Sequence, residues 1–478
     1  MASHKPFGLH FGTAGLRGVV GEGADQMNVT NVKRATAGIA AYLGPGKRVV
    51  VGCDARHGSA EFYDAALQVL SGAGVHALAL TPQRPTPVTA FAVKHLGADA
   101  GIMITASHNP PEYNGYKVYL SDGIQIVPPA DADIAAAIEE APEDPPLSDD
   151  LIEHVDVTDE FISAAAAMGV PGDLKIVVTP MHGVGGETLV AALKRAGFGD
   201  VRVVDKQMEP DPDFPTVRFP NPEEPGALDL ALELAEEAGA DIVIAADPDA
   251  DRMAVAAEGV QLSGDETGLL LGHYLASKGL KGSLANSIVS GRALGKVAEK
   301  FGLKHYETLT GFKWIARAPE LGFGYEEAIG FCCDPSHVSD KDGISAAVVF
   351  ASLAAELKAQ GVGVLEHLAR VREEFGGYTT APLTFRVSDT SLISEAMERL
   401  RAEPPVSLAG AQVVQTVDLN DHEPPTDGIM FFTDADDRVV CRPSGTEPKL
   451  KCYLEVAGDA ARLETLKKDV AHATGMEK

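Results

Sequence analysis

A polar turn, "TASHNPPEYNGYKVY", runs from Thr105 to Tyr119 and holds residues that could carry a phosphoryl group. It follows "AGIMI", an apolar run that is typical of a buried strand. Its prolines, asparagines and glycine favour a stiff, exposed loop, because proline removes a donor while glycine and asparagine tolerate turn geometry. Ser107 and His108 lie in this turn, outside the G-x-S-x-G pattern of acyl hydrolases. The chemistry that remains for this serine is to carry a phosphoryl group.

Three carboxylates at alternate positions form a second candidate site. Asp247, Asp249 and Asp251 follow the apolar run "ADIVIAA". Oxygen ligands suit hard cations, so we expect these side chains to converge on Mg²⁺ or Ca²⁺. A solvated acidic turn is one alternative. An EF-hand calcium loop is another, although Arg252 occupies the position that requires glycine and a predicted strand, not a helix, leads into the segment.

The segment "RPSGTEPKLK", from Arg442 to Lys451, could hold a phosphate. A guanidinium, an ammonium, two hydroxyls and the backbone donors around a glycine provide both charge and directional hydrogen bonds. The residues concerned are Arg442, Ser444, Gly445, Thr446 and Lys449. A β-turn with a solvated basic flank is the alternative. The chain has no Walker-type loop, so a nucleotide phosphate is not indicated.

Two further segments are weaker candidates. "FGTAGLRG", residues 11–18, places Arg17 in a glycine-rich loop that by itself favours a structural turn. "YEEAIGF", residues 325–331, places Glu326 and Glu327 after a predicted strand, where they could accept hydrogen bonds from sugar hydroxyls. The same two carboxylates could equally begin a helix and complement its dipole.

The elements that must position these residues alternate between apolar runs and amphipathic stretches. "RVVVGCD", "SAEFYDAALQVLSGAG", "VHALAL", "TPVTAFAVKHLG" and "AGIMIT" predict strand, helix, strand, helix and strand. This order indicates a mainly parallel sheet with helices on its faces. The pattern begins again at "LKIVVTP" and near "GSLANSIVSG". After "EEFGGYTTAPLTFRV" the order changes to a strand, a helix, several strands and a last helix.

The length of 478 residues predicts about three or four domains, and the pattern of elements favours four. The expected fold class is α/β, with three similar mixed-sheet units and a smaller C-terminal α+β unit. The predicted boundaries give domains of residues 1–165, 166–281, 282–376 and 377–478. The acidic, proline-rich segment 139–150 is expected to be a solvated connection.

Net charge, the length of apolar runs and the cysteines indicate which partners and which cellular compartment to expect. The net charge is 40 − 69 = −29, which disfavours nucleic acid and anionic membranes as partners. No window reaches the ~18 unbroken apolar residues of a membrane span, and the N-terminus lacks the order of a secretory signal. The five cysteines form no paired metal-ligand spacing. We therefore expect a cytoplasmic protein without a zinc site or a disulfide framework.

Five segments, in order over nearly the whole chain, resemble the α-D-phosphohexomutases, the phosphoglucomutase and phosphomannomutase superfamily. They are "FGTAGLRG", "TASHNPPEYNGYKVY", "DPDADR", "YEEAIGF" and "RPSGTEPKLK". "ETLTGFKWIA", which contains Lys313, and "DKDGISAAV", which contains Lys341, look most similar to the phosphoglucomutase and phosphopentomutase branch. The resemblance implies four domains around a central cleft, each contributing one loop.

At the reacting end of the substrate, the resemblance implies that Ser107 is the phosphoserine. One Mg²⁺ ion, which also touches the serine phosphate, would be held by Asp247, Asp249 and Asp251. The basic side chains expected around the reacting phosphoryl group are Arg17, Lys117 and Arg252. Proton transfer needs a general acid and base, and the candidates that stay open are His108, Lys117 and Lys341.

At the sugar end, the resemblance implies that Glu326 and Glu327 face sugar hydroxyls. The other residues expected to bind substrate are Lys313, Arg442, Ser444, Gly445, Thr446 and Lys449. Two positions depart from the family pattern. Ala328 stands where many members have a hydroxyl residue, and Phe331 stands where some have histidine. The preferred sugar therefore stays open among glucose, mannose and a pentose.

The implied activity is a phosphosugar mutase that moves phosphate between the 1- and 6-positions, or the 1- and 5-positions, through a sugar bisphosphate that also serves as activator. Phosphoglucomutase is the first expectation, and phosphopentomutase and phosphomannomutase are the alternatives. The expected partners are small sugar phosphates, bound by a monomer or a homodimer. A magnesium-dependent phosphatase is the enzymatic rival, and it would release phosphate. A binding protein without catalysis would be expected to have lost the serine or the acidic triad, and both are intact.

Overall fold

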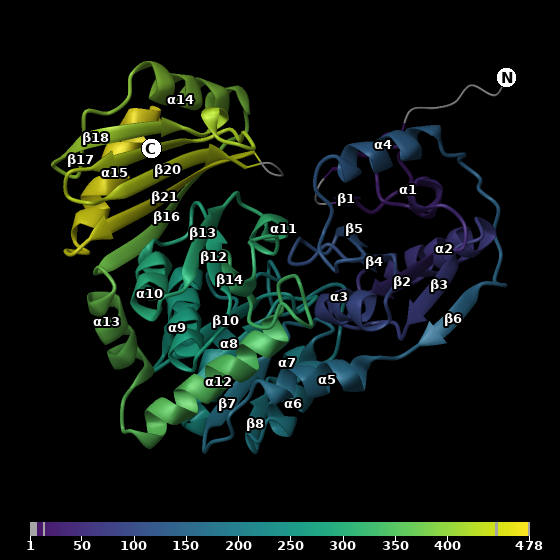
Figure 1. Cartoon of the computed structure of the whole chain (residues 1–478), viewed down its shortest axis with the longest axis horizontal. Coiled ribbons are helices and arrows are strands. Elements are labelled where there is room, and N and C mark those ends of the chain that lie inside the picture. The colour runs from purple at the N-terminus through teal and green to yellow at the C-terminus, as the bar shows by residue number, and fades with distance from the viewer. Residues whose placement is uncertain (1–6, 13–14, 445–447, 477–478) are drawn as a thin grey trace.

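The computed structural model describes residues 7–12, 15–444 and 448–476. Its strands form four sheets that follow one another along the chain (Figure 1). The first three sheets mix parallel and antiparallel pairs, and the fourth is antiparallel throughout. Three mixed α/β units and a C-terminal α+β unit were predicted, and this fold class is confirmed.

The first unit carries the serine turn after an interior strand of its sheet. The sheet order is β1-β5-β4-β2-β3-β6, in which β2, β3, β4 and β6 are parallel and β5 is antiparallel to both its neighbours. All five residues of β4 are buried, as expected for a strand covered on both faces. The strands are β1 (Leu16–Val19), β2 (Arg48–Cys53), β3 (His76–Leu80), β4 (Ala100–Ile104), β5 (Tyr113–Leu120) and β6 (Ile152–Val155). The helices are α1 (Val29–Leu43), α2 (Ser59–Gly72), α3 (Thr86–His95) and α4 (Ala130–Glu140).

The second unit carries the acidic turn after its buried central strand. The sheet order is β11-β10-β9-β7-β8, with β8, β7 and β9 parallel and β10 antiparallel to β9. The strands are β7 (Lys175–Thr179), β8 (Asp200–Val203), β9 (Ile242–Ala246), β10 (Met253–Ala257) and β11 (Val260–Gln261). The helices are α5 (Thr158–Ala167), α6 (Gly186–Arg195), α7 (Asp205–Met208) and α8 (Asp229–Ala238).

The third unit has the sheet order β13-β12-β14-β15, and only β15 is antiparallel to its neighbour. Its helix α9 begins with a capping box, in which Ser263 and Glu266 satisfy each other's backbone donors. The strands are β12 (Ser283–Ser287), β13 (Lys304–Thr308), β14 (Leu321–Glu326) and β15 (Gly330–Cys332). The helices are α9 (Gly264–Ser277), α10 (Ala293–Phe301), α11 (Phe312–Ile315), α12 (Gly343–Ala359) and α13 (Val364–Glu374).

The C-terminal unit is a six-stranded antiparallel sheet in the order β16-β21-β20-β19-β18-β17. Its strands are β16 (Tyr378–Arg386), β17 (Ser407–Leu408), β18 (Ala411–Asp418), β19 (Ile429–Thr433), β20 (Arg438–Pro443) and β21 (Lys449–Ala457). The helices are α14 (Ser391–Ala402) and α15 (Arg462–Thr474), with the short 3₁₀ helix η1 (Leu419–Asp421) after β18. Its main apolar core is a separate cluster, and a smaller cluster packs Leu419, Met430 and Val440 against Ile288 and Val289 of the third unit.

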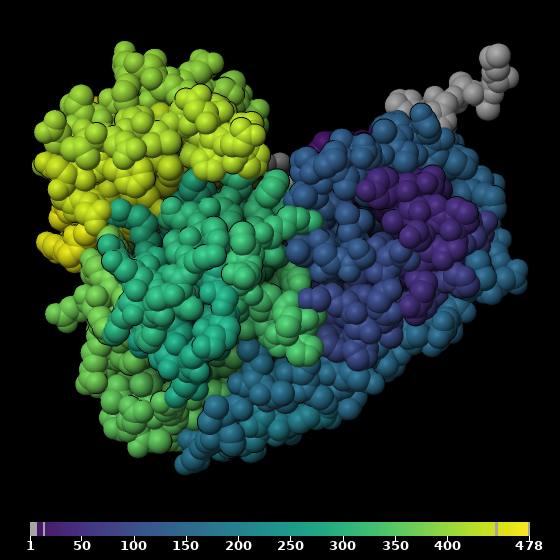
Figure 2. All heavy atoms as spheres, in the orientation of Figure 1, coloured from purple at the N-terminus to yellow at the C-terminus, as the bar shows by residue number. Residues whose placement is uncertain are grey.

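One apolar cluster runs from the first unit through the second and third, and α12 lies within it. The first three units are therefore packed together. The C-terminal unit lies beside the third unit, and an open notch separates it from the first unit (Figures 1 and 2). Among the described residues, no single helix is long and apolar enough to cross a membrane. In the part of the chain that the structure describes, one pair of helices, α12 and α13, passes such a test together, with a bend of 101° between them.

Two arginines fasten the C-terminal unit to the third unit. Arg292, before α10, donates its backbone N–H to Glu455 at 2.8 Å and its Nη1 to Asp436 at 2.8 Å. Arg438, on β20, donates in the opposite direction to the carbonyl oxygens of Ile288, at 3.2 Å, and Ser290. The C-terminal sheet is therefore held against the loop that follows β12.

Candidate active site

Ser107 lies where β4 ends and faces the acidic turn of the second unit. Its Oγ donates to Oδ2 of Asp247 at 2.9 Å and lies 3.2 Å from Nδ1 of His108. The prediction that this serine is exposed is wrong, since only 3% of its surface is accessible. The second unit covers it, and that contact is not visible in the local sequence. Ser107 also adopts a left-handed backbone, with φ at 51°, which is uncommon for a residue other than glycine.

The three aspartates converge as predicted. One oxygen atom from each of Asp247, Asp249 and Asp251 lies within 4.8 Å of the other two, and all three side chains are buried. The alternative of a solvated acidic turn is therefore wrong, and the strand β9 in place of a helix excludes an EF-hand. Within the described residues, Oδ1 of Asp249 and Oδ1 of Asp251 are buried without a hydrogen-bond partner. Unpartnered buried carboxylate oxygens fit the hard ligand set of Mg²⁺.

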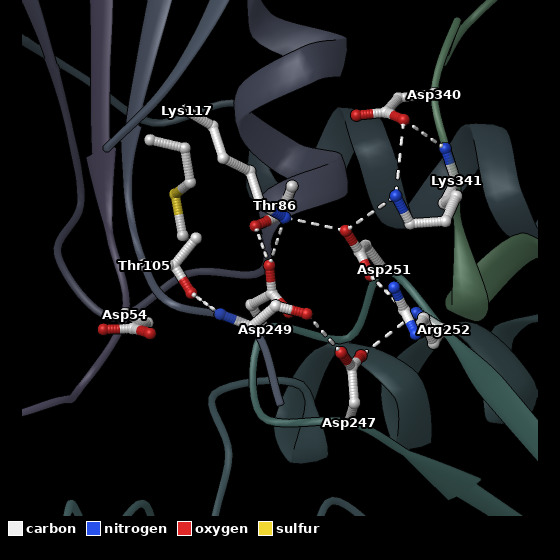
Figure 3. A network of polar contacts seen from close by, with 12 residues as sticks. Asp54, Thr86, Thr105, Lys117, Asp247, Asp249, Asp251, Arg252, Asp340 and Lys341 are labelled. Atoms are coloured by element: carbon white, nitrogen blue, oxygen red, sulfur yellow. Dashed lines mark hydrogen bonds and ion pairs between the residues drawn. The ribbon is translucent and has the colours of Figure 1, made fainter. Parts of the chain in front are cut away.

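Two buried lysines from other units approach this triad (Figure 3). Nζ of Lys117, on β5, lies 2.7 Å from oxygens of both Asp249 and Asp251. Nζ of Lys341 lies 3.4 Å from Asp251 and 3.8 Å from Asp340. The site therefore joins residues of the first, second and third units.

The charges around the triad shift the pKa values of Asp247 and Asp251 in opposite directions. Burial and the like charges of Asp249 and Asp251 raise the pKa of Asp247 well above its ordinary value. Burial opposes ionisation of Asp251 too, but Lys117 and the other nearby cations outweigh it and lower its pKa. Asp251 is thus ionised in the folded protein. An additional cation placed in the cluster would favour the ionised form of Asp247 as well.

Two arginines lie close to the acidic triad and to the serine turn. The backbone N–H of Arg252 donates to Asp247 at 3.0 Å (Figure 3). Its guanidinium lies 3.9 Å from Glu326. Arg17 donates to the side chain of Asn109 at 3.2 Å. Burial and the charge of Arg252 lower the pKa of Arg17. Burial, with these two guanidinium groups, also lowers the pKa of the neighbouring His108, so its imidazole is neutral. Such a concentration of positive charge is suited to an anion.

Glu326 and Glu327, which are expected to face sugar hydroxyls, lie at a tight turn between two strands. We call residues 325–331 the sugar loop. Glu326 ends β14, and Tyr325 pairs with Phe331 of β15, so the alternative of a helix N-terminus is wrong. Glu327 accepts hydrogen bonds from the hydroxyls of Ser287, at 2.9 Å, and Ser290, at 3.2 Å. Phe331 is fully buried and stacks near Tyr325, with ring centroids 6.5 Å apart. This position therefore offers no acid or base to a substrate.

The residues predicted to bind the non-reacting phosphate belong to a β-hairpin of the C-terminal unit, formed by β20 and β21. Arg442 on β20 pairs in register with Lys451 on β21, and Ser444 donates its N–H to the carbonyl of Lys449 at 2.8 Å. Nε of Arg442 is buried and, within the described part of the chain, has no hydrogen-bond partner. Two further candidates, Gly445 and Thr446, lie outside the described residues.

Lys313 lies on the short helix α11 of the third unit. Burial lowers its pKa to about 8, with the nearby charges of Arg317 and Lys341 acting in the same direction. Glu326 acts in the opposite direction, which places Lys313 within electrostatic reach of the sugar loop. Lys313 is therefore a cation at neutral pH that is ready to lose its proton in mildly alkaline solution.

Sequence reasoning missed several residues that hold these groups. Thr86, at the start of α3, donates its hydroxyl to Oδ2 of Asp249 at 2.5 Å and its N–H to the Asp249 carbonyl at 2.9 Å. Arg56 donates to backbone carbonyls of the serine turn. A signal for Arg56 was available, because it follows β2, and β2 and β4 are parallel neighbours whose ends lie together. No local pattern pointed to Thr86, since its partner belongs to another unit.

Comparison with known proteins matches all four units to one family. Models described as phosphoglucomutase/phosphomannomutase alpha/beta/alpha domains I, II and III match residues 8–144, 153–260 and 263–372. The model of the C-terminal domain of the same family matches residues 392–473.

Individual relatives extend over most of the chain. A Haemophilus influenzae protein named "Probable phosphomannomutase" is 45% identical over 452 residues, which cover 90% of this chain and 93% of that protein. A Schizosaccharomyces pombe protein named "Probable phosphoribomutase" is 36% identical, with coverage of 98% and 89%. The crystal structure of a phosphoglucomutase/phosphomannomutase family protein from Burkholderia thailandensis is similar with a TM-score of 0.78 at 22% identity, and 97% of each chain is covered.

Proposed function

The chain belongs to the phosphoglucomutase/phosphomannomutase family and is a phosphosugar mutase, and we propose that it works through a phosphoserine at Ser107. The observation that carries this proposal is the 2.9 Å contact between the Ser107 hydroxyl and Asp247, within the buried triad. A serine that only supported the fold would not need three carboxylates, two lysines and two arginines around it. These groups suit a phosphoryl group that must be held and neutralised.

The proposed metal ligands are Asp247, Asp249 and Asp251, together with the phosphate on Ser107. Mg²⁺ bound there would neutralise oxygen charge that develops during phosphoryl transfer. Lys117 and Thr86 hold Asp249 from the first unit. Arg17 and Arg252 are proposed to bind the reacting phosphoryl group.

The proposed reaction has two transfers. A sugar hydroxyl oxygen attacks phosphorus and its proton passes to a protein base, while the bond from Ser107 Oγ to phosphorus breaks and Oγ takes up a proton from a protein acid. The sugar bisphosphate then turns over, and Ser107 Oγ attacks the phosphorus of the other phosphoryl group as its own proton passes to a protein base. The bond from that phosphorus to the second sugar oxygen breaks, and this oxygen takes up a proton. The proton carriers remain among His108, Lys117 and Lys341, and Nδ1 of His108 lies 3.2 Å from Ser107 Oγ. The bisphosphate is also the proposed activator, since it can phosphorylate a free serine.

Substrate preference is proposed from the sugar loop. Glu326 and Glu327 supply strong acceptors, whereas Ala328 at the turn supplies no hydroxyl. A site without a polar partner cannot strongly reject an analogue that lacks the matching group. We therefore expect activity on glucose 1-phosphate, measurable activity on a pentose 1-phosphate, and weaker use of mannose 1-phosphate. The names of the relatives include both mannose and ribose activities, so they do not decide this point.

The remaining substrate contacts are proposed for Lys313, Arg442, Ser444, Gly445, Thr446 and Lys449. The acidic composition supports small sugar phosphates as partners, in a cytoplasmic monomer or homodimer, and disfavours nucleic acid or membranes.

The experiment is a competition assay with glucose, mannose, ribose and deoxyribose 1-phosphates, each with trace bisphosphate and Mg²⁺. We expect kcat/KM for mannose 1-phosphate to be the lowest among glucose, ribose and mannose. A value for mannose 1-phosphate well above the others would show that the preference is wrong while leaving the mutase activity intact. Inorganic phosphate is measured in the same samples, because its stoichiometric release would indicate the phosphatase rival.

A further inference from the structure

We propose that Arg56 is a positioning residue that fixes the shape of the phosphoserine loop through its backbone. The inference rests on the proposed role of Ser107. It concerns how that residue is presented to the substrate, in a loop that must hold a left-handed conformation at its reactive position.

Arg56 donates to four carbonyl oxygens of one loop. Its Nη2 donates to Ser107 at 2.6 Å and to Asn109 at 2.5 Å. Its Nη1 donates to Pro110 at 2.9 Å and to Tyr113 at 3.1 Å. Only 4% of the Arg56 surface is accessible, so water does not compete for these donors. One rigid, planar group therefore fixes the direction of four peptide units.

The same contacts show that Arg56 does not act on the phosphoryl group directly. Each terminal nitrogen of a guanidinium carries two hydrogens, and both are used on each nitrogen. The remaining Nε lies 3.4 Å from Oδ2 of Asp54. Arg56 thus differs from Arg17 and Arg252, because it has no terminal donor left for a ligand.

The guanidinium is itself held on two sides. On one side, Asp54 forms the ion pair and accepts a further hydrogen bond from Ser59 at 2.6 Å. On the other side, the ring of Phe214 from the second unit lies 5.0 Å from the Arg56 guanidinium carbon. Phe214 is buried, so the second unit closes over this support as well as over Ser107. Rotation of the Arg56 side chain away from the loop is therefore blocked.

The need for such a support follows from the backbone. A non-glycine residue with positive φ persists only where the surroundings over-determine its conformation. In the serine turn, Thr105 accepts from the Ser107 N–H at 2.9 Å, and Arg56 binds the Ser107 carbonyl. Both ends of the strained residue are thereby fixed. Loss of one support would leave Ser107 free to shift by fractions of an ångström, which is enough to slow an in-line transfer.

The test compares Arg56→Lys with Arg34→Lys. Lysine offers a single nitrogen that cannot reach four carbonyls. Arg34 is a matched control, because it is buried, donates to the carbonyls of Ile138 and Glu139, and lies over the ring of Phe7 at 5.5 Å. With the full chain and Mg²⁺, we expect Arg56→Lys to lower kcat about a hundredfold with little change in KM. Arg34→Lys should leave kcat per folded molecule unchanged.

Two readouts separate positioning from general destabilisation. The ³¹P resonance of the phosphoserine should shift or broaden in Arg56→Lys but not in Arg34→Lys. Added guanidinium at millimolar concentration should restore part of kcat in Arg56→Ala and none in Arg34→Ala. Should Arg56→Lys fail to fold, Phe214→Leu keeps the arginine and removes its cover, and it should give a smaller loss of kcat with the same change in the resonance.

The proposal would be overturned by a folded Arg56→Lys protein with kcat close to that of the wild type. Equal losses in Arg56→Lys and Arg34→Lys would overturn it too, as would an unchanged kcat in the Phe214→Leu variant. Failure of the underlying assignment looks different, because phosphate in the wild-type protein would then map to a residue other than Ser107.

Discussion

The hydroxyl of Ser107 donates a 2.9 Å hydrogen bond to Asp247, although 140 residues separate the two in the chain. The serine lies in the turn after a strand of the first unit, and the aspartate follows a strand of the second. Their contact places a nucleophile at the edge of a carboxylate cluster. A phosphoryl group on Ser107 would replace this hydrogen bond and bring its own negative charge to the cluster, which explains why cations from three units surround it.

Purified protein should be partly phosphorylated on Ser107, and Ser107→Ala should have no mutase activity. The chain offers a matched control in Ser336, which also stands 3.2 Å from the histidine that follows it but is exposed and distant in sequence from the acidic triad. Intact mass and peptide mapping would locate the phosphate. Full activity in Ser107→Ala, or phosphate on Ser336, would contradict the assignment.

Asp249→Ala should lower kcat by at least about a hundredfold, because the metal site stabilises charge that develops during transfer. Excess chelator should have the same effect on the wild type, and added Mg²⁺ should reverse it there but not in the variant. Asp99→Ala, at an exposed ion pair with Lys47, is the control. Undiminished turnover in excess chelator would remove the metal from the mechanism.

Arg442→Ala should mainly raise KM, since its proposed phosphate is bound alike before and during the reaction. A charged hydrogen bond of this kind contributes roughly 1.5–3 kcal/mol, so the expected increase is about ten- to a hundredfold. Arg386→Ala, on strand β16 of the same sheet, removes an exposed arginine and should change KM little. If instead kcat falls and KM stays constant, Arg442 acts at the reacting phosphate.

Activity should decline as the pH rises through about 8, because Lys313 then loses the charge with which it is proposed to bind substrate. The sign follows from its lowered pKa: the cationic form is complete below that value and disappears above it. Arginine stays charged throughout this range, so Lys313→Arg should lose the alkaline decline in kcat/KM. Lys296→Arg, at an exposed position on α10, should keep it. An unaltered pH profile in Lys313→Arg would exclude this role.

The strands that carry the site were predictable because each is a short apolar run followed by a polar turn. β4 and β9 are such runs, and the turns after them hold Ser107 and Asp247. The arrangement of the units was predictable from the repetition of the pattern, and the sheets confirm it. The exact domain boundaries and the cytoplasmic location stay predictions.

The burial of Ser107 could not be predicted, because it depends on a neighbouring unit that the local sequence does not contain. The same holds for Thr86, because its hydroxyl can donate to Asp249 only where the first two units pack together. The turn at Glu326 was ambiguous for a different reason. Two carboxylates after a strand fit both a helix start and a tight turn, and only the pairing of Tyr325 with Phe331 decides between them.

Lys117 and the acidic triad belong to different units, and this has a consequence for dissection of the enzyme into fragments. Separated, the first unit would expose a lysine without its two carboxylates, and the second would keep three crowded carboxylates without Lys117. Losing one partner of a buried ion pair typically costs about 3–5 kcal/mol. A split enzyme should therefore regain activity only when both halves are mixed, and the charge complementarity itself would drive their reassembly.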